Sequence, residues 1–377
     1  MKGALLYVDA GKGHYIPAIA LEESFKETEH EVVVENLFVV LDSPRLNSSC
    51  KKSWRFLLHH PKVEYVWNTV MDETRIGRTL QKIATQPVYR KNFKQWYEQN
   101  KPDFIVSTNF IGGYVLPKII KKLGLNIPVF QYAADVFDTP QSGINNKLTK
   151  MYMPSLIGYN NAVKKGQKKE TLTICPFPLQ KKFEKLKALN ISKQEMRAKL
   201  GLEDKFTILY NLGGEGIGSI DFLNEMAKRG HNWQVLLIGG KSSIIDRKLA
   251  LFNKLHPKAT VHKLGFINNV PEYLVASDIQ IGKAGTNALL EAVYMSCPCL
   301  ISDILFAAKA TKEFFKEYPL GWGENDAKKQ VKIVEDYIKK LDEGNHSNNN
   351  PGIEFSSDKL RDLILKDTDD YYNNLNK

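Results

Sequence analysis

The chain has 377 residues, of which 43% are hydrophobic and 25% charged, so it is long enough for two globular domains of ~150–200 residues each. Its net charge of +11 favours an anionic partner: nucleic acid, an acidic membrane surface or a phosphorylated ligand. No apolar stretch approaches the ~20 residues that a membrane-spanning helix needs, and the cysteines lack the CxxC or Cys/His spacing of a metal site. The amino terminus has no signal-peptide pattern, so we expect a cytoplasmic protein.

The chain begins with a strand-like segment, a glycine-rich turn and a helix-like segment. The apolar run over 4–8 leads into Gly11-Lys12-Gly13-His14, and residues 15–26 then have helical periodicity. Backbone N–H groups in such a turn can approach an anion at the amino terminus of the following helix. Because this turn carries a histidine, we expect acid/base chemistry on this side of the molecule.

Helix-length segments separate the further strands that we predict in the first half of the chain. These strands lie at 31–38, 104–107, 129–132, 150–153 and 173–178. Such alternation favours a parallel, doubly wound sheet, and the prolines in the last segment mark where that sheet ends.

A second series of strands begins near Lys205 and repeats this architecture. The strand at 207–210 runs into the second glycine-rich turn, Gly213-Gly214-Glu215-Gly216-Ile217-Gly218, and further strands are expected at 234–238, 259–262, 279–281 and 299–302. We therefore predict an α/β protein with two Rossmann-like domains, at 1–177 and 178–350, and a charged helical tail at 351–377. Because parallel sheets bind ligands beyond the carboxyl ends of their strands, we expect the site in a cleft between the domains.

Three segments of the second half, taken in order, resemble glycosyltransferase family 28. They are ILYNLGGEGIG from Ile208, LGFINNVPEYLVASD from Leu264 and IGKAGTNALLEAVYMSCPCLISD from Ile281. The GxGH turn of the first half, Tyr132–Asp135 and Met151–Ser155 fall in step with the same family. The chain is most similar to its monogalactosyldiacylglycerol synthases and processive diacylglycerol glucosyltransferases. This resemblance implies a GT-B fold, a UDP-sugar donor, an inverting hexosyl transfer, and no metal or other cofactor in the chemistry.

The resemblance places the donor nucleotide on the second half of the chain. Glycine N–H groups and a helix amino terminus would stabilise the charge on the departing diphosphate. Gly265 and Phe266 would hold the uracil, and the Glu291 carboxylate would accept hydrogen bonds from the ribose hydroxyls. The residues so assigned to the nucleotide sugar are Gly214, Glu215, Gly216, Gly218, Gly265, Phe266, Lys283, Ala284, Gly285, Thr286, Asn287 and Glu291.

An inverting transfer needs a base that removes the proton of the acceptor hydroxyl as it attacks the anomeric carbon. His14 in the GxGH turn is the candidate, because the unperturbed pKa of histidine lies close to working pH. Asp135, at the end of a strand, would orient or stabilise the imidazole. The alternatives are a histidine that caps the helix it begins and a carboxylate that caps a helix.

Residues 45–94 fit neither Rossmann domain, because they interleave aromatic with basic side chains. Such a segment suits the interface of an anionic membrane, although a solvated helical face over an ordinary core has the same pattern. With the resemblance, we expect this segment to meet the lipid acceptor, at the inner face of the cell membrane. The residues assigned to the membrane or acceptor are Gly13, Trp54, Arg55 and Trp67.

The chain departs from the family pattern in two places. Ala307-Ala308-Lys309 replaces the Gly-Gln-Glu that commonly contacts the donor sugar, and Ala288 replaces a threonine. The main expectation is transfer of a hexose from a UDP-sugar to diacylglycerol, which makes a glycolipid. The alternatives are transfer to another lipid-linked acceptor of the lipid II type, and a non-catalytic protein that binds nucleotide or lipid. The sequence has no recognisable nucleic-acid-binding module, so we do not expect that partner.

Overall fold

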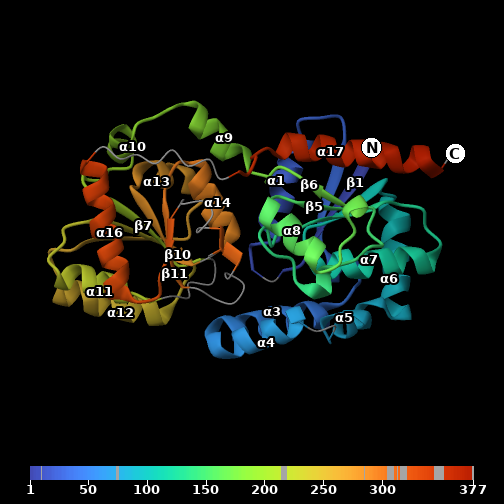
Figure 1. Ribbon diagram of the computed structural model, residues 1–377, viewed down its shortest axis with the longest axis horizontal. Coiled ribbons are helices and arrows are strands. Elements are labelled where there is room, and N and C mark those ends of the chain that lie inside the picture. Colours follow the sequence, from blue (N-terminus) through green and yellow to red (C-terminus); the bar gives the residue numbers. More distant parts are fainter. Residues whose placement is uncertain are drawn as a thin grey trace. The chain divides into compact units, whose positions relative to one another are not determined.

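The computed structural model describes residues 1–9, 11–73, 76–213, 219–283, 285–303, 310–311, 313–314, 321–343 and 352–375 (Figure 1). The chain forms two compact units. Met1–Lys181 and Gly352–Lys377 make up the first unit, and Lys182–Pro351 makes up the second. The first unit therefore extends slightly beyond the boundary expected at residue 177, and it includes the carboxyl-terminal helix.

A parallel six-stranded sheet forms the middle of the first unit, in the order β2-β1-β3-β4-β5-β6. The chain continues from β1 to β2 on one side and later to β3 on the other, so the topological switch point lies between β1 and β3. The strands are β1 (Lys2–Tyr7), β2 (Glu31–Asn36), β3 (Phe104–Ser107), β4 (Val129–Tyr132), β5 (Lys150–Met153) and β6 (Leu172–Ile174).

All strands predicted in the first half are present, but two end earlier than the sequence indicates: β6, expected at 173–178, ends at Ile174, and β2 ends at Asn36. The side chain of Asn36 accepts a hydrogen bond from the N–H of Phe38, and this cap begins the short helix α2 (Leu37–Val40). The apolar residues of 37–40 therefore form a helical turn instead of prolonging the strand.

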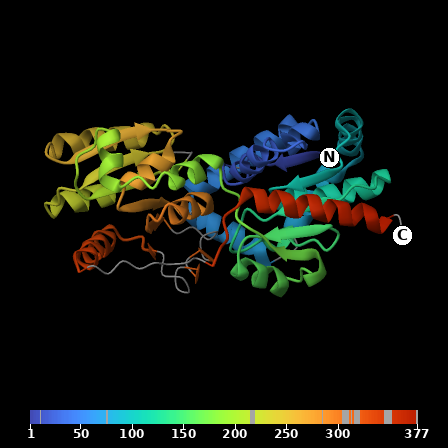
Figure 2. The ribbon, with the colours of Figure 1, turned by 90° about the horizontal axis from the view of Figure 1, so that it is seen from above.

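Helices cover both faces of this sheet. On one face Leu5 packs with Leu21 of α1 (Tyr15–Phe25) and with Leu360 of α17 (Ser357–Leu375). On the other face Leu6 packs with Val115 of α7 (Phe110–Leu123), as the two-residue period of a strand requires. Figure 2 shows α17, in red, lying along the first unit, where its contact with α1 fixes it. The tail expected from the sequence is thus a structural layer of the first unit.

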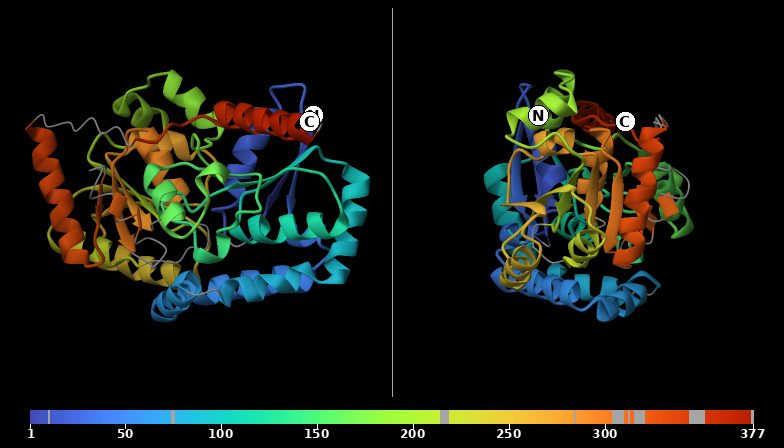
Figure 3. Two further views of the ribbon diagram at one scale, coloured as in Figure 1. Left: turned by 45° about the vertical axis from the view of Figure 1, so that its right-hand side comes forward. Right: turned by 90° about the vertical axis from the view of Figure 1, so that its left-hand side faces the viewer.

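A run of helices separates β2 from β3 in the first unit. It comprises α3 (Pro44–His59), α4 (Pro61–Glu73), α5 (Ile76–Gln81) and α6 (Pro87–Asn100). Figure 3 shows α3 and α4, in blue, on the side of the first unit opposite α17. Helix α3 contains no buried residue, whereas α6 buries Phe93 and Trp96. The described residues of 45–94 are therefore mostly helical, and their buried apolar side chains, Ala84 and Phe93, lie in the last part.

The second unit is built around another parallel six-stranded sheet, in the order β12-β11-β10-β7-β8-β9. Its switch point lies between β7 and β10. The strands are β7 (Thr207–Asn211), β8 (Gln234–Ile238), β9 (Thr260–Gly265), β10 (Ile279–Lys283), β11 (Cys299–Asp303) and β12 (Gly321–Gly323). The edge strand β12 was not predicted. The helices are α9 (Lys181–Ala188), α10 (Lys193–Lys199), α11 (Asp221–Lys228), α12 (Ser243–Leu255), α13 (Val270–Ala276), α14 (Thr286–Tyr294) and α16 (Ala327–Asp342).

None of the helices in the described ranges combines the length and the apolar character needed to cross a bilayer.

Candidate functional site

The GxGH turn lies at the switch point of the first sheet. Leu6 of β1 is in register with Ser107 of β3, so Thr108, the residue after β3, lies beside the turn that follows β1. Gly11 has φ +84°, a left-handed conformation that glycine adopts without steric cost. The carbonyl of Lys12 then accepts the N–H of Ile16 at 3.0 Å and begins α1. The turn therefore carries His14 to the carboxyl ends of β1 and β3.

Two hydrogen bonds join His14 to Thr108. Nδ1 of His14 lies 2.9 Å from the carbonyl oxygen of Thr108, and Oγ1 of Thr108 donates to the carbonyl of His14 at 2.6 Å. Because a carbonyl oxygen only accepts, Nδ1 donates this hydrogen bond, and Nε2 is the ring nitrogen that the bond leaves available. Thr108 is fully buried, and its N–H donates to Leu6 at 3.0 Å, so this partner is itself fixed.

The alternative role of His14 as a helix cap is wrong. His14 occupies the N-cap position of α1, but its side chain caps no N–H of that helix. One nitrogen of the imidazole is instead held by the backbone carbonyl of Thr108, an orientation that general-base chemistry would use.

Asp135 interacts with His14 through its charge. It is half-buried and follows β4, the strand next to β3. Burial raises the pKa of its carboxyl, whereas the positive charges of His14 and Lys165 lower it. A positive charge on His14 therefore favours the ionised form of Asp135. The bond that orients the ring comes from Thr108, which the sequence analysis did not identify.

The neighbouring carboxylate, Asp138, has a different partner. Nζ of Lys165 donates to Asp138 Oδ1 at 2.8 Å and to the carbonyl of Thr139 at 3.0 Å. Asp138 therefore helps to fix the loop after β4, while Asp135 is the carboxylate that acts on His14.

Helix α3 is attached to the turn that carries His14. Lys51 forms an ion pair with Asp9, just beyond β1. Nε1 of the half-buried Trp54 lies 3.2 Å from the position that a Cβ on Gly11 would take, whereas Gly13 has open space at the equivalent point. Trp54 thus lies against the candidate acceptor turn, and Arg55 beside it is exposed.

Large apolar side chains are exposed along α3, α4 and the start of α5. Trp67 is 44% and Val66 is 62% exposed, and α3 has no acidic residue in its sequence PRLNSSCKKSWRFLLH. An exposed apolar surface with basic neighbours is typical of a membrane or partner contact. Its apolar members are Phe56, Val63, Tyr65, Val66, Trp67, Val70 and Ile76, and we call this set the apolar surface.

The candidate nucleotide residues of the second unit gather at its own switch point. Gly282 of β10 is in register with Asn211 of β7, and a Cβ on Gly282 would lie 2.5 Å from the Asn211 carbonyl oxygen, so glycine permits this close approach. The predicted residues Gly214, Glu215, Gly216, Gly218 and Ala284 lie outside the described residues, as do Ala307, Ala308 and Lys309.

Hydrogen bonds link the turns after β7, β8 and β9. The N–H of Gly240 donates to Gly213 at 2.9 Å, and the N–H of Gly239 donates to Gly265 at 2.9 Å. Next to Gly265, the ring of Phe266 is 67% exposed at the carboxyl edge of the sheet. Gly265 and Phe266 therefore lie where a doubly wound sheet binds its ligand.

The other predicted nucleotide residues follow β10. Lys283 ends this strand, Gly285 is the N-cap residue of α14, and Thr286 and Asn287 form its first turn. Glu291, further along α14, is half-buried. Burial raises the pKa of its carboxyl to about 7, and the charge of Lys182 opposes this shift.

Lys182 connects two of these elements, and the sequence analysis did not identify it. Its Nζ donates to the carbonyl of Asn268 at 3.1 Å, in the loop that begins at Gly265, and its charge acts on Glu291. The elements expected to hold uracil and ribose are therefore near one another in the structure.

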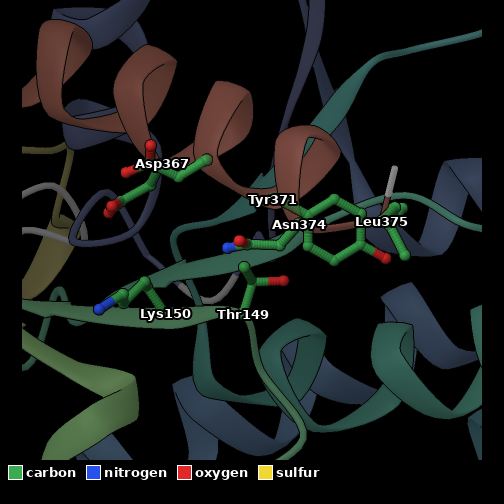
Figure 4. A pocket seen from close by; sticks show the side chains of 7 residues that line it. Thr149, Lys150, Asp367, Tyr371, Asn374 and Leu375 are labelled. Carbon is green, nitrogen blue, oxygen red and sulfur yellow. The ribbon is translucent and has the colours of Figure 1, made fainter. Parts of the chain in front are cut away.

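A hollow of about 400 Å³ lies elsewhere on the first unit, between β5 and α17 (Figure 4). Thr149 and Lys150, at the start of β5, line it together with Asp367, Asp370 and Tyr371 of α17. In a parallel sheet the start of a strand lies at the edge opposite its carboxyl end, so this hollow is at the edge away from His14. Asp367 accepts a hydrogen bond from the Tyr152 hydroxyl at 2.8 Å, which attaches α17 to the sheet.

Comparison with curated proteins gives galactolipid synthases, whereas no family model matches the chain. The chain is 25% identical over 354 residues to monogalactosyldiacylglycerol synthase 1 of Arabidopsis thaliana, covering 89% of this chain and 64% of that protein. It is 26% identical over 328 residues to a probable monogalactosyldiacylglycerol synthase of Nicotiana tabacum, and the match covers 82% of this chain and 59% of that protein. The chain thus spans about three fifths of the length of these relatives.

A bacterial relative has a different acceptor in its name. It is the UDP-N-acetylglucosamine–N-acetylmuramyl-(pentapeptide) pyrophosphoryl-undecaprenol N-acetylglucosamine transferase of Carboxydothermus hydrogenoformans. The two chains are 26% identical over 318 residues, which cover 82% of this chain and 80% of that protein.

Solved structures with this fold include UDP-GlcNAc 2-epimerases. The enzyme from Neisseria meningitidis bound to UDP-GlcNAc has a TM-score of 0.58 at 14% identity, covering 97% of this chain and 99% of that chain. The enzyme from Methanocaldococcus jannaschii in complex with UDP-GlcNAc and UDP has a TM-score of 0.55 at 13% identity, with the same coverage. The predicted α/β GT-B fold is confirmed, and so is the resemblance to glycosyltransferase family 28 through its monogalactosyldiacylglycerol synthases.

Proposed function

We propose that this chain is an inverting glycosyltransferase that moves a hexose from a UDP-sugar to diacylglycerol at a membrane surface, forming a glycolipid and UDP. The observation that carries the proposal is the pairing of His14 Nδ1 with the Thr108 carbonyl at 2.9 Å, which leaves Nε2 as a base at the switch point. The names of the Arabidopsis and tobacco relatives support a galactolipid-type product.

In the proposed reaction, Nε2 of His14 takes the proton of the acceptor hydroxyl. The hydroxyl oxygen attacks the anomeric carbon on the face opposite UDP, and the bond from that carbon to the diphosphate oxygen breaks, so its electron pair leaves with UDP. The negative charge of Asp135 stabilises the imidazolium that forms, as the effect of His14 on the pKa of Asp135 indicates. The configuration at the anomeric carbon is inverted.

On the nucleotide side, Glu291 would accept the ribose hydroxyls, and Gly265 and Phe266 would contact the uracil. Lys283 and the amino terminus of α14 would face the diphosphate, where a cation and the N–H groups of the first helical turn would stabilise developing negative charge. We therefore propose that no metal takes part. Treatment with EDTA is expected to leave the rate unchanged, and a loss that Mg²⁺ or Mn²⁺ restores would contradict this part.

The apolar surface and the basic residues of α3 would bind the membrane that contains the acceptor. Aromatic rings bury in the headgroup region, and each cation contributes about 1 kcal/mol on an anionic surface. Because α3 is attached to the GxGH turn through Lys51 and Trp54, membrane binding would bring the acceptor to the side of the first unit that carries His14.

The test is incubation of the purified protein and its His14→Ala variant with diacylglycerol-containing vesicles and a panel of labelled UDP-sugars. A labelled glycolipid that requires both diacylglycerol and His14 is the expected result. Product with a polyprenyl-diphosphate-linked acceptor alone would favour the second candidate, to which the Carboxydothermus relative points. UDP binding without product from any donor would favour a non-catalytic protein, as Ala307, Ala308 and Lys309 suggest.

A further inference from the structure

We infer that Lys182 is a positioning residue of the nucleotide site, which holds the loop after β9 and the Glu291 carboxylate in the arrangement that receives the uridine of the donor. This inference rests on the proposed function and deepens its donor half. It concerns a residue that lies outside every motif of the sequence analysis.

Helix α9 is fixed against α14, so the place of Lys182 is defined. Nζ of Lys187 donates to the carbonyl of Tyr294 and lies 4.2 Å from the centre of its ring. Phe183 and Leu186 of α9 are buried. With the helix anchored at these points, Lys182 near its amino terminus reaches Asn268 at 3.1 Å while its charge acts on Glu291.

Lys182 is the cation whose charge affects Glu291 in the described part of the second unit. Other ionisable groups on the elements packed against α14 are Glu184 and Lys187 of α9, which act at Tyr294, and Cys299 of β11, whose thiol contacts the carbonyl of Leu289. Lys283 ends β10, two residues before the N-cap of α14. Glu291 is the one charged residue in the α14 sequence TNALLEAVY.

Ribose binding requires an ionised carboxylate at Glu291. Two hydroxyl donors need two acceptor oxygens, and a protonated carboxyl group presents one O–H donor instead. Burial favours that protonated form, whereas a nearby ammonium group favours the ionised form. Because Lys182 also donates to the Asn268 carbonyl, its charge is held in place, and there it favours the carboxylate form of Glu291 that accepts the ribose.

Calorimetric titration with UDP between pH 6 and pH 8.5 tests the inference. Lys182→Met keeps the apolar stem and removes the charge, Lys182→Arg keeps the charge, and Lys185→Ala changes an exposed lysine on the same helix as the matched control. At pH 7 the Met variant is expected to bind UDP roughly three- to tenfold more weakly, because without the ammonium group the pKa of Glu291 rises further and a smaller fraction of it is ionised. This deficit should shrink toward pH 8.5, where Glu291 loses its proton without help, and the Arg and Lys185 variants should match the original protein.

A double variant separates positioning from direct contact. If Lys182 acts through Glu291, Lys182→Met should change UDP affinity little in a Glu291→Gln background. Additive effects, or a deficit that is equal at every pH, would overturn the inference. Thermal unfolding of each variant verifies that it is folded, and Lys182→Gln replaces the Met variant if that one is not. If the original protein binds no UDP, the proposed function fails; if it binds UDP and all Lys182 variants match it, the inference alone fails.

Discussion

The main polar side chains at the two switch points, His14 and Glu291, differ in their hydrogen-bond partners. In the first unit, His14 already has an internal partner, because the Thr108 carbonyl fixes one ring nitrogen at 2.9 Å. In the second unit, the Glu291 carboxylate has no hydrogen-bond partner among the described residues, and burial raises its pKa to about 7. A group that transfers a proton must be oriented before the reaction, whereas a group that binds a ligand keeps its hydrogen-bonding capacity for that ligand. The difference fits the proposed division between catalysis and nucleotide binding.

The strongest test of this comparison is His14→Ala. The proposed transfer is expected to fall by roughly 10²–10⁴, the usual contribution of a positioned general base, while the Kd for UDP stays unchanged. Initial rates with labelled donor, together with a calorimetric titration, measure both quantities. His14→Gln keeps a polar side chain of similar reach and should be equally inactive. Transfer at near-normal rate in either variant would remove His14 from the mechanism.

The second test is Glu291→Gln, in the other unit. Since the pKa of Glu291 is about 7, the fraction of carboxylate falls about tenfold per pH unit below that value. UDP affinity of the original protein is therefore expected to decrease as the pH falls below 7, in addition to the change caused by UDP's own phosphate. The Gln variant should bind UDP roughly tenfold more weakly at pH 8 and should lose the part of the pH dependence that belongs to the protein. An identical pH profile in both proteins would show that Glu291 does not bind the nucleotide.

The contrast between the units also explains what the sequence could predict. The strands of both sheets other than β12, the first glycine turn and the position of His14 follow from local patterns: two-residue periodicity, and glycine between a strand and a helix. The roles of Thr108 and Lys182 cannot be predicted from local patterns, because they depend on strand order and helix packing. Thr108 lies 94 residues from its partner His14, and Lys182 lies 86 residues from Asn268. The available signal for Thr108 was a polar residue directly after the strand that pairs with β1.

The segment 45–94 illustrates the same limit. Its mixture of aromatic and basic residues predicted an unusual surface, but it did not distinguish side chains that pack from side chains that are exposed. The structure separates Phe93, which is buried in the core of the first unit, from Trp67, which is 44% exposed. Trp54 is intermediate and lies against Gly11.

A third prediction uses this separation within the first unit. Trp67→Ala is expected to weaken binding to anionic phospholipid vesicles by roughly threefold to tenfold, because an exposed aromatic ring buries in the interface without a role in the core. Sedimentation with vesicles measures the effect, and thermal unfolding should stay unchanged. Leu251→Ala, which removes an apolar side chain that is 58% exposed on α12 of the second unit, is the control. Equal losses in the two variants would contradict a membrane-binding role for the apolar surface in particular.

The smallest expected effect concerns the bond that holds the His14 backbone. Thr108→Val keeps the shape of the side chain but removes the Oγ1 donor that reaches the His14 carbonyl at 2.6 Å. Loss of this bond is expected to lower the free energy of unfolding by about 1 kcal/mol. The kcat of the proposed transfer should decrease only about threefold, because the backbone carbonyl that orients the imidazole remains and a loosened turn places the ring less accurately. Denaturant unfolding and initial rates measure the two effects.

Thr108→Ser restores the hydroxyl without the methyl group, so it should recover both values. If the Ser variant is as impaired as the Val variant, then packing of the methyl group, and not the hydroxyl donor, holds the turn that carries His14.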